Sequence, residues 1–223
     1  MNQPDKPGFV PEVVYRAYLG GLLTHDLQQC HASFQQWLEA DTGLRSTYED
    51  LVRRSLYQVG DLWERGQISV ATEHLATANS ESLLNLTYPR LFAQPRNGKS
   101  AVITCVPNEY HQIGGKMVAD VFELHGWRGY FLGANTPEGE AITLIAEKRS
   151  EVVALSVATT FGLAEVVSAT ALIRAAFPEV AILVGGQAFR WGGKERVERL
   201  LGVRCLTSLG ELEAWIKEHD NHV

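Results

Sequence analysis

The spacing of hydrophobic residues changes along the chain, and the change falls near residue 95. From Pro11 to about Phe92 hydrophobic residues recur three or four positions apart, which places them on one face of a helix. Polar breaks divide this part, and the pattern predicts helices at Val10–Leu23, Leu27–Leu38, Tyr48–Trp63 and Val70–Phe92. Four helices with short connections predict an antiparallel bundle over residues 1–94.

The rest of the chain has a different pattern. Residues 95–100 are polar and rich in turn formers, and they read as a linker. After them, short hydrophobic runs predict strands at Ala101–Val106, Gly129–Leu132, Val152–Val157, Val180–Val184 and Val203–Leu206. Amphipathic segments predict helices at about Ile113–His125, Glu138–Lys148, Leu163–Phe177, Lys194–Leu201 and Leu209–His219. Alternating strands and helices predict a doubly wound, Rossmann-like (flavodoxin-like) parallel sheet over residues 101–223.

Composition narrows the class of protein. The chain is 45% hydrophobic with a net charge of −6, and it has no block of Lys or Arg. These features argue against direct binding to nucleic acid or to an anionic membrane. Without a signal peptide or an apolar run of about 20 residues, the chain is expected to be cytoplasmic. Cys30, Cys105 and Cys205 lie far apart, which favours reduced, buried thiols over disulfides or a zinc site.

Candidate binding residues follow the predicted strands. Ligands of doubly wound sheets bind beyond the carboxyl ends of the strands, so residues placed there are expected to share one edge. Taken singly, a loop histidine, a serine at a strand end and a pair of glycines have ordinary structural roles. Their joint position favours a binding site formed by Glu109, His111, Ser156, Thr159, Thr160, Gly185 and Gly186.

His111 is the candidate metal ligand at this edge. A metal-bound imidazole usually donates its second N–H to a carboxylate or a carbonyl, and Glu109 is two residues away. One imidazole and one outer carboxylate cannot hold a bare metal ion. The remaining ligands are therefore expected from a macrocycle.

These elements resemble those of cobalamin-binding domains. That family has an Asp-x-His-x-x-Gly motif, then Ser-x-Leu and Gly-Gly at fixed distances. Here "EYHQIG" runs from Glu109 to Gly114, "SVA" begins at Ser156 after 41 intervening residues, and "GG" begins at Gly185 after 26 more. Both intervals match the family's spacing.

The resemblance implies a cofactor and a binding mode. His111 would be the lower axial ligand to cobalt and would displace the cofactor's nucleotide base, which gives base-off binding. The base tail would enter a slot beside Ser156, with room left by Gly185 and Gly186. The remaining cofactor contacts would come from Glu109, Tyr110, Gly114, Thr159 and Thr160.

The sequence departs from the family motif at two positions. Glu109 stands where the family has Asp, and Ala158 stands where it has Leu. Glutamate is one methylene longer, so the sequence leaves open whether its carboxylate lies beside His111 or beyond it. A domain that has lost cofactor binding is therefore one alternative.

The helical half carries a second resemblance. Trp63, nine intervening residues, and Glu73 with His74 match the Trp-x9-Glu-His signature of cobalamin-dependent light sensors. Gly66 can end the third helix and Ser69 can cap the fourth, which would bring these residues to one end of the bundle. By resemblance, Trp63 covers the upper cobalt ligand, and Glu73 and His74 supply polar contacts. Some of these sensors have a histidine directly after the tryptophan, where this chain has Glu64.

Two classes of function follow from the resemblance. The first is a standalone photoreceptor or regulatory sensor, not an enzyme, that binds adenosylcobalamin or hydroxocobalamin. It would signal through a dimer or a protein partner, without the DNA-binding domain of the light-dependent repressors, and a second tetrapyrrole such as a bilin or haem is compatible with it. The alternative is a corrinoid protein that carries methyl groups for a separate methyltransferase.

Overall fold

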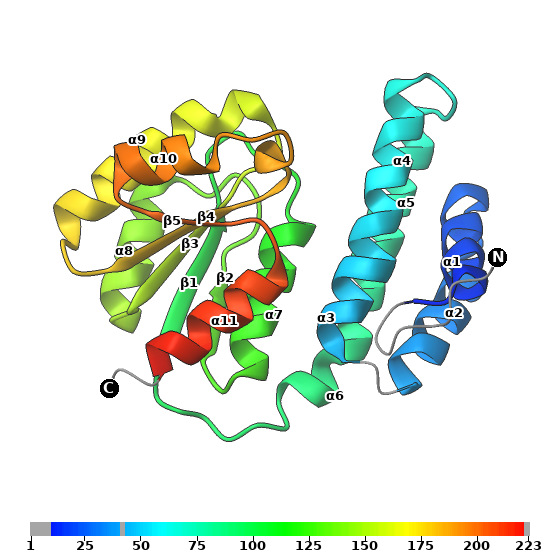
Figure 1. Cartoon of the computed structure of the whole chain (residues 1–223), viewed down its shortest axis with the longest axis horizontal. Helices are drawn as coiled ribbons and strands as arrows, with labels where there is room; N and C mark the ends of the chain where they lie inside the picture. Colours follow the sequence, from blue (N-terminus) through cyan, green and yellow to red (C-terminus); the bar gives the residue numbers. More distant parts are fainter. Residues whose placement is uncertain (1–9, 41–42, 221–223) are drawn as a thin grey trace. The chain divides into compact units, whose positions relative to one another are not determined.

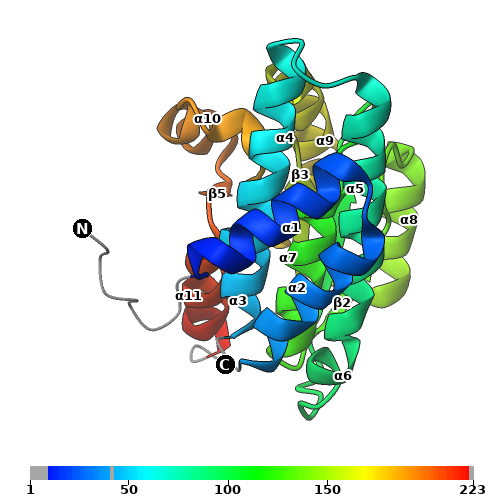
Figure 2. The same cartoon turned by 90° about the vertical axis from the view of Figure 1, so that its right-hand side faces the viewer.

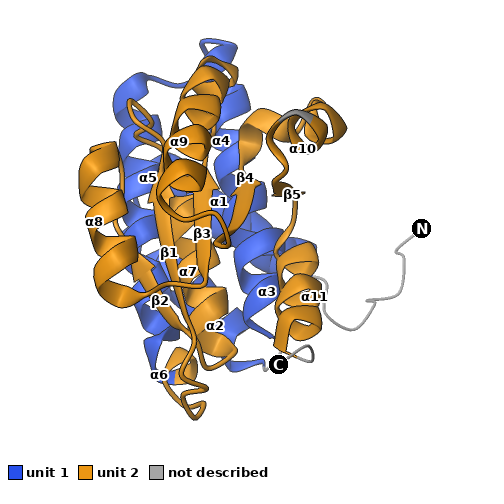
Figure 3. Cartoon of the chain, turned by 90° about the vertical axis from the view of Figure 1, so that its left-hand side faces the viewer, with its two compact units in different colours: residues 1–89 blue, residues 90–223 orange. Residues whose placement is uncertain are grey.

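The computed structural model describes residues 10–40 and 43–220. The chain forms two compact units, residues 1–89 and residues 90–223, which are shown in two colours in Figure 3. Within the described residues, no helix combines the length and the apolar character needed to cross a membrane.

The first unit is helical, as the sequence predicts. Its third helix is continuous from Leu44 to Glu64, and a short 3-10 turn and helix follow its fourth. The elements are α1 (Glu12–Thr24), α2 (Leu27–Glu39), α3 (Leu44–Ser46), η1 (Thr47–Arg53), α4 (Arg54–Glu64), α5 (Val70–Leu84), η2 (Asn85–Thr87) and α6 (Tyr88–Leu91). Figure 2 shows α1 and α2 lying against α4 and α5.

Buried tyrosines join helices that are distant in the sequence. The Tyr18 hydroxyl donates to Ser80 Oγ at 3.0 Å, and the hydroxyls of Tyr48 and Thr87 lie 2.8 Å apart. Both rings are fully buried. The burial of their apolar surface and the hydrogen bonds of their hydroxyls therefore both stabilise the contacts between these helices. Residues Thr47–Arg53 form a π-helical segment, which the sequence pattern does not predict.

The second unit is a five-stranded parallel sheet with helices on both faces, so the predicted fold class is confirmed. The strand order is β2-β1-β3-β4-β5. The strands are β1 (Ser100–Cys105), β2 (Arg128–Phe131), β3 (Val152–Ser156), β4 (Ala181–Gly185) and β5 (Arg204–Leu206). The helices are α7 (Ile113–Leu124), α8 (Glu138–Lys148), α9 (Leu163–Ala176), α10 (Lys194–Leu201) and α11 (Leu209–Asp220), with 3-10 turns η3 (Thr160–Gly162) and η4 (Gln187–Phe189).

The helices divide between the two faces of the sheet. Helices α7 and α11 pack together, and α9 packs against both α8 and α10 (Figure 1). Each central strand is buried on both faces, which explains its continuous hydrophobic run. The face under α8, α9 and α10 is filled mainly by branched aliphatic side chains, among them Val102, Val153, Leu155, Ile173 and Val184.

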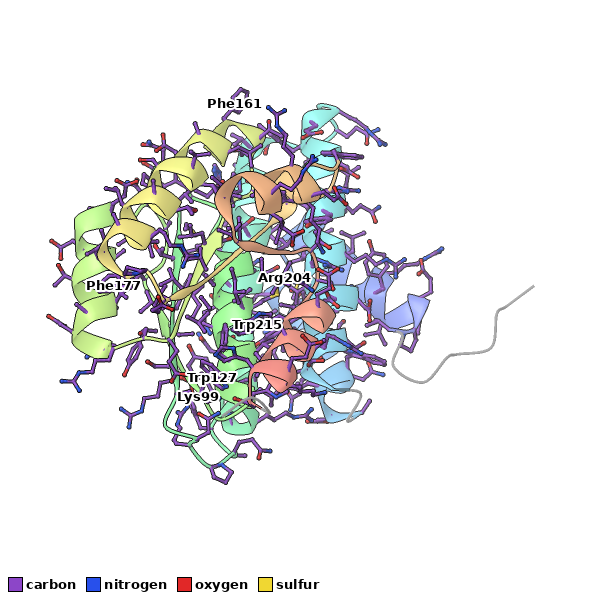
Figure 4. All side chains as sticks on the ribbon, turned by 60° about the vertical axis from the view of Figure 1, so that its left-hand side comes forward. Lys99, Trp127, Phe161, Phe177, Arg204 and Trp215 are labelled. Atoms are coloured by element: carbon purple, nitrogen blue, oxygen red, sulfur yellow. The ribbon has the colours of Figure 1, made fainter. Side chains whose placement is uncertain are left out.

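The beginning of β1 and the end of α11 are joined by polar and aromatic contacts. Lys99 Nζ lies 2.9 Å from Asp220 Oδ1, and Trp127 Nε1 donates to Asp220 Oδ2 at 3.4 Å. The Trp215 and His219 rings stack with centroids 4.6 Å apart. Figure 4 shows Lys99, Trp127 and Trp215 along the side of this unit that carries α11.

Candidate functional site

Three neighbouring strands end side by side at the carboxyl edge of the sheet. Cys105 on β1 pairs with Ser156 on β3, and Ser156 pairs with Gly185 on β4. The ladder continues one residue further, because Val106 N–H donates to Ser156 O at 3.1 Å and Val157 N–H donates to Gly185 O at 2.9 Å. Segments distant in the sequence are thereby brought to one edge, where parallel sheets bind ligands.

The loop after β1 is held in a defined shape by hydrogen bonds to the loop after β2. Asn108 has a left-handed φ of 61°, and its N–H donates to Asn135 Oδ1 at 2.9 Å. Asn135 N–H in turn donates to Glu109 O at 3.1 Å. Sequence analysis did not identify Asn135, whose only local signal is its place in the turn-rich stretch "GANTPEG". These bonds fix the backbone from which Glu109 and His111 project.

Glu109 lies beside His111, which settles the question raised by its extra methylene. Its Oε1 atom lies 2.6 Å from His111 Nδ1 and accepts a hydrogen bond from His111 N–H at 2.9 Å. Its Oε2 atom accepts from the backbone N–H groups of Ala158 and Thr159, at 2.8 Å and 3.2 Å. The longer side chain therefore reaches His111 and the loop after β3 together.

The Glu109 carboxylate is a fixed negative charge. Its side chain is only 2% exposed, and burial alone would raise its pKa. The hydrogen bonds from His111 and Ala158 outweigh burial and lower the pKa to about 2. A carboxylate in this state can only accept hydrogen bonds, so His111 Nδ1 is assigned as the protonated nitrogen.

His111 has the chemistry of an axial ligand. With the proton on Nδ1, a neutral imidazole would carry its lone pair on Nε2, and the side chain is 63% exposed at the sheet edge. The carboxylate on Nδ1 raises the basicity of Nε2. A single imidazole donor suits a metal whose other ligands come from a macrocycle. Among the described residues, no three His, Cys, Asp or Glu side chains are grouped so that they could hold a metal ion.

The start of α7 leaves space beside Ser156. A Cβ atom on Gly114 would meet only Ser156 Oγ, at 3.8 Å, which is an ordinary contact. The protein itself therefore does not require glycine there, and the missing side chain leaves room for a ligand group. Gly115, which sequence analysis did not single out, differs because its Cβ would lie 3.0 Å from the Phe131 ring.

Gly185 and Gly186 serve close packing of the backbone. A Cβ on Gly185 would lie 2.6 Å from Leu206 O, and one on Gly186 would lie 2.1 Å from Val157 O. Gly186 also has a φ of 126°, which residues with side chains rarely adopt. The pair thus lets the ends of β3, β4 and β5 approach each other. Any space that these glycines leave for a cofactor would result from this close packing of the strand ends.

The other predicted contacts at this edge are accessible. Tyr110 is 68% exposed, Thr159 is partly buried and Thr160 is exposed at the start of η3. Cys105 is buried below the loop, with Sγ 3.8 Å from His111 O, and burial raises its thiol pKa to about 12. Cys30, Cys105 and Cys205 are all buried and free, as predicted.

Trp63, Glu73 and His74 belong to the helical unit, at the turn between α4 and α5. Gly66 ends α4 with a left-handed φ of 67°, donating to Trp63 O at 2.8 Å while Gln67 donates to Leu62 O at 2.9 Å. This is a Schellman motif. Ser69 Oγ caps α5 by accepting from Thr72 N–H at 3.1 Å. The predicted helix end and helix cap are therefore both present.

The side chains at this turn are open to solvent. Trp63 is 47% exposed and His74 is 69% exposed. Glu73 accepts from Thr77 Oγ1 at 3.1 Å, whereas its carboxylate lies 3.9 Å from His74 Nδ1. Val70 and Leu75 add further exposed apolar surface at the same helix end.

Family models match both units. Residues 99–206 match a model described as B12 binding domain, and residues 14–86 match a second model with the same description. Two curated relatives come from Myxococcus xanthus. They are the HTH-type transcriptional repressors CarA, 30% identical over 66% of this chain, and CarH, 27% identical over 64%. The chain spans about half the length of each repressor, 50% and 48%.

Solved structures share the fold. The monomethylamine corrinoid protein of Methanosarcina barkeri superposes with a TM-score of 0.79 over 93% of this chain and 98% of its own, at 13% identity. The methanol:cobalamin methyltransferase complex MtaBC of the same organism gives a TM-score of 0.51 over 97% of this chain and 85% of the matched chain, at 12% identity. At these identities the likeness concerns the fold alone.

Proposed function

Because this chain belongs to the family of B12-binding domain proteins, we propose that it is a cobalamin-dependent sensor with His111 as the lower axial ligand. The observation that supports this ligation is the Glu109–His111 pair, in which His111 Nδ1 lies 2.6 Å from Glu109 Oε1, so that ligation would use Nε2. Gly114 and Ser156 would accommodate the displaced base of the cofactor, since the space beside them holds no side chain from Gly114. Base-off binding follows from these assignments.

The remaining residues of the edge would complete the cofactor site. Tyr110 and Thr160 are exposed there, and Thr159 is held by Glu109. Gly185 and Gly186 would act through the backbone packing that they permit. Bound cobalamin would supply a cobalt centre whose upper cobalt–carbon bond is sensitive to light.

We propose that Trp63 of the helical unit covers the upper cobalt ligand and that Glu73 and His74 supply polar contacts to it. Support comes from the Trp-x9-Glu-His signature and from the two sequence relatives, which are named as transcriptional repressors and hence as regulators. The exposed Trp63 ring offers an apolar surface for an adenosyl group. Adenosylcobalamin is therefore the proposed dark-state form and hydroxocobalamin the product after light.

The proposed output is a change in self-association or in contact with a protein partner. A ligand shifts such an equilibrium only if one state binds the partner better. The net charge of −6 argues against direct recognition of nucleic acid by this chain. A second tetrapyrrole, a bilin or haem, is an extension of the same proposal.

A corrinoid methyl carrier is the second candidate. It is favoured by the fold, because the monomethylamine corrinoid protein of Methanosarcina barkeri superposes over 93% of this chain with a TM-score of 0.79. A carrier would serve a separate methyltransferase and would need no response to light. The two candidates therefore differ in what illumination does.

Visible spectra and size-exclusion profiles distinguish the candidates. The protein is loaded with adenosylcobalamin or hydroxocobalamin and measured in the dark and after green light. A sensor shows a new spectrum together with a change in apparent mass or partner binding. A light-independent assembly state, with methyl transfer from methylcobalamin to an added acceptor system, would favour the carrier. Failure to retain either cobalamin would contradict both.

A further inference from the structure

One carboxylate links two loops at the edge of the sheet. Glu109 Oε1 binds both N–H groups of His111, and Oε2 binds the backbone N–H groups of Ala158 and Thr159. We propose that Glu109 is a positioning residue that couples His111 to the segment Val157–Gly162, and that this coupling requires the length of glutamate. The inference rests on the proposed role of His111 as the axial ligand.

The backbone of Glu109 is held in place. Its N–H donates to Val106 O at 3.1 Å, and its carbonyl accepts from Asn135 N–H at 3.1 Å. The preceding Asn108 is also tied to Asn135, through its side-chain oxygen at 2.9 Å. A shorter side chain at this position therefore cannot be compensated by a small shift of the loop.

The contacts of Glu109 span a distance that aspartate cannot cover. Removing one methylene withdraws the carboxyl group by about 1.5 Å, the length of one carbon–carbon bond. The distance from Ala158 N to the carboxylate oxygen is 2.8 Å with glutamate. With aspartate it would exceed the range of a hydrogen bond. An aspartate that keeps its hydrogen bonds to the neighbouring His111 would therefore lose those to Ala158 and Thr159.

The segment Val157–Gly162 is held on its far side by the turn after β4. Val157 O accepts from Ala188 N–H at 3.3 Å. It lies only 2.1 Å from the position that a Cβ atom on Gly186 would take. The segment carries Phe161, which is 92% exposed and stands away from the ribbon in Figure 4. A change at His111 is therefore transmitted through Glu109 to an exposed aromatic side chain.

Amide hydrogen exchange in the cofactor-free protein tests the link directly. The Ala158 and Thr159 amides are expected to exchange at least about tenfold more slowly than unprotected amides, because each donates to an ionised carboxylate. Unprotected exchange at both amides in the wild-type protein would overturn the inference without any variant.

Two substitutions at Glu109 then separate the effect of its side-chain length from the effect of its charge. In E109D both amides are expected to exchange about tenfold faster, and E109Q should lose protection on one side because its amide group has one acceptor oxygen. The matched control is E140D, the same change at an exposed position in the first turn of α8, where exchange at both amides should stay within about twofold. Wild-type protection in E109D would overturn the inference. If E109D does not fold, protection of the Ala158 and Thr159 amides in the wild-type protein decides whether Glu109 reaches them.

Cofactor loading tests the coupling. Hydroxocobalamin should change amide exchange at Phe161 and Gly162 in the wild-type protein but not in E109D, whose affinity should fall about 10- to 100-fold. Equal changes in both proteins would overturn the coupling. If the wild-type protein retains no cobalamin, the proposed function fails, whereas the exchange result in the cofactor-free protein still decides the reach of Glu109.

Discussion

Each unit contains a glutamate close to a histidine, yet the two pairs differ in almost every physical respect. Glu109 is 2% exposed and lies 2.6 Å from His111, whereas Glu73 is 24% exposed and lies 3.9 Å from His74. Glu109 receives four N–H donors from residues 111, 158 and 159. The contacts of the other pair stay within α5, to Thr77 and to the carbonyl of Val70.

The difference arises from the local backbone. Consecutive residues of a helix point in different directions, so Glu73 and His74 cannot face each other. Glu109 and His111 are separated by one residue in a loop, and that loop turns both side chains together. The comparison indicates that the polar groups at the sheet edge are held by contacts within the protein itself. The polar side chains at the turn between α4 and α5 have few hydrogen bonds that would be lost if they moved to contact a ligand.

The largest expected effect is on the free energy of unfolding, when one glycine from each region is replaced by alanine. Gly186→Ala places a Cβ about 2.1 Å from Val157 O at a φ of 126°, and should lower the free energy of unfolding by about 4 kcal/mol. Gly66→Ala has nothing within 4 Å of the new Cβ and should lose only about 1 kcal/mol, from its left-handed backbone. Denaturant titrations measure both. Similar losses would contradict the idea that the sheet edge is the more constrained region.

The second prediction concerns pH. The pKa of Glu109 is about 2 in the folded protein, below the value of about 4.3 expected when unfolded. The resulting stability, about 3 kcal/mol, is therefore present above pH 4.3 and is lost as the pH falls toward 2. Unfolding of E109Q should show a correspondingly smaller loss over this range. Parallel pH profiles for the wild-type protein and E109Q would show that the carboxylate is not held as described.

A third prediction compares the two histidines. His111→Ala should weaken binding of hydroxocobalamin by about 100-fold and move its visible spectrum toward that of the free cofactor, because the axial nitrogen is lost. His74→Ala should change the affinity by less than about threefold, since its ring is 69% exposed and is not proposed to hold the lower face. His31→Ala, an exposed position on α2, is the control for removing an imidazole. Equal losses for His74 and His111 would remove the distinction between the two sites.

The smallest effect on stability is expected at Trp63. Its ring is 47% exposed, so Trp63→Ala should lower the free energy of unfolding by about 1 kcal/mol or less. The proposed function nevertheless predicts that the variant binds adenosylcobalamin and photolyses it at an altered rate. Leu75→Ala, with the same exposed fraction of 47%, is the matched control. An unchanged photoresponse would remove Trp63 from the proposed mechanism.

The fold could be predicted because its signals are local. Strand and helix boundaries in the second unit fall within a residue or two of the hydrophobic runs that predict them, and α8 and α10 coincide with their predictions. The end of α4 at Gly66 and the cap at Ser69 also follow from residue type and position alone. The π-helical segment at Thr47–Arg53 could not be foreseen, because the spacing of hydrophobic residues predicts only a helix there and does not distinguish its type.

The candidate site could be predicted only in part from the sequence. The spacing of Glu109, Ser156 and Gly185 indicates that they meet at one edge, because parallel strands end together. Sequence does not show where the second oxygen of Glu109 points, since Ala158 is 49 residues away and contributes only its backbone. Likewise, Gly186 reads as a turn glycine until the carbonyl of Val157 is seen against it.

The contact between Lys99 and Asp220 has a consequence for the history of such proteins. It holds the entry to β1 and the end of α11 at one place on the second unit. A domain whose two ends are neighbours can be inserted into, or joined to, different host proteins without being stretched. The B12-binding unit is thus suited to exchange as a cassette, so that natural or engineered fusions could join it to many different partner domains.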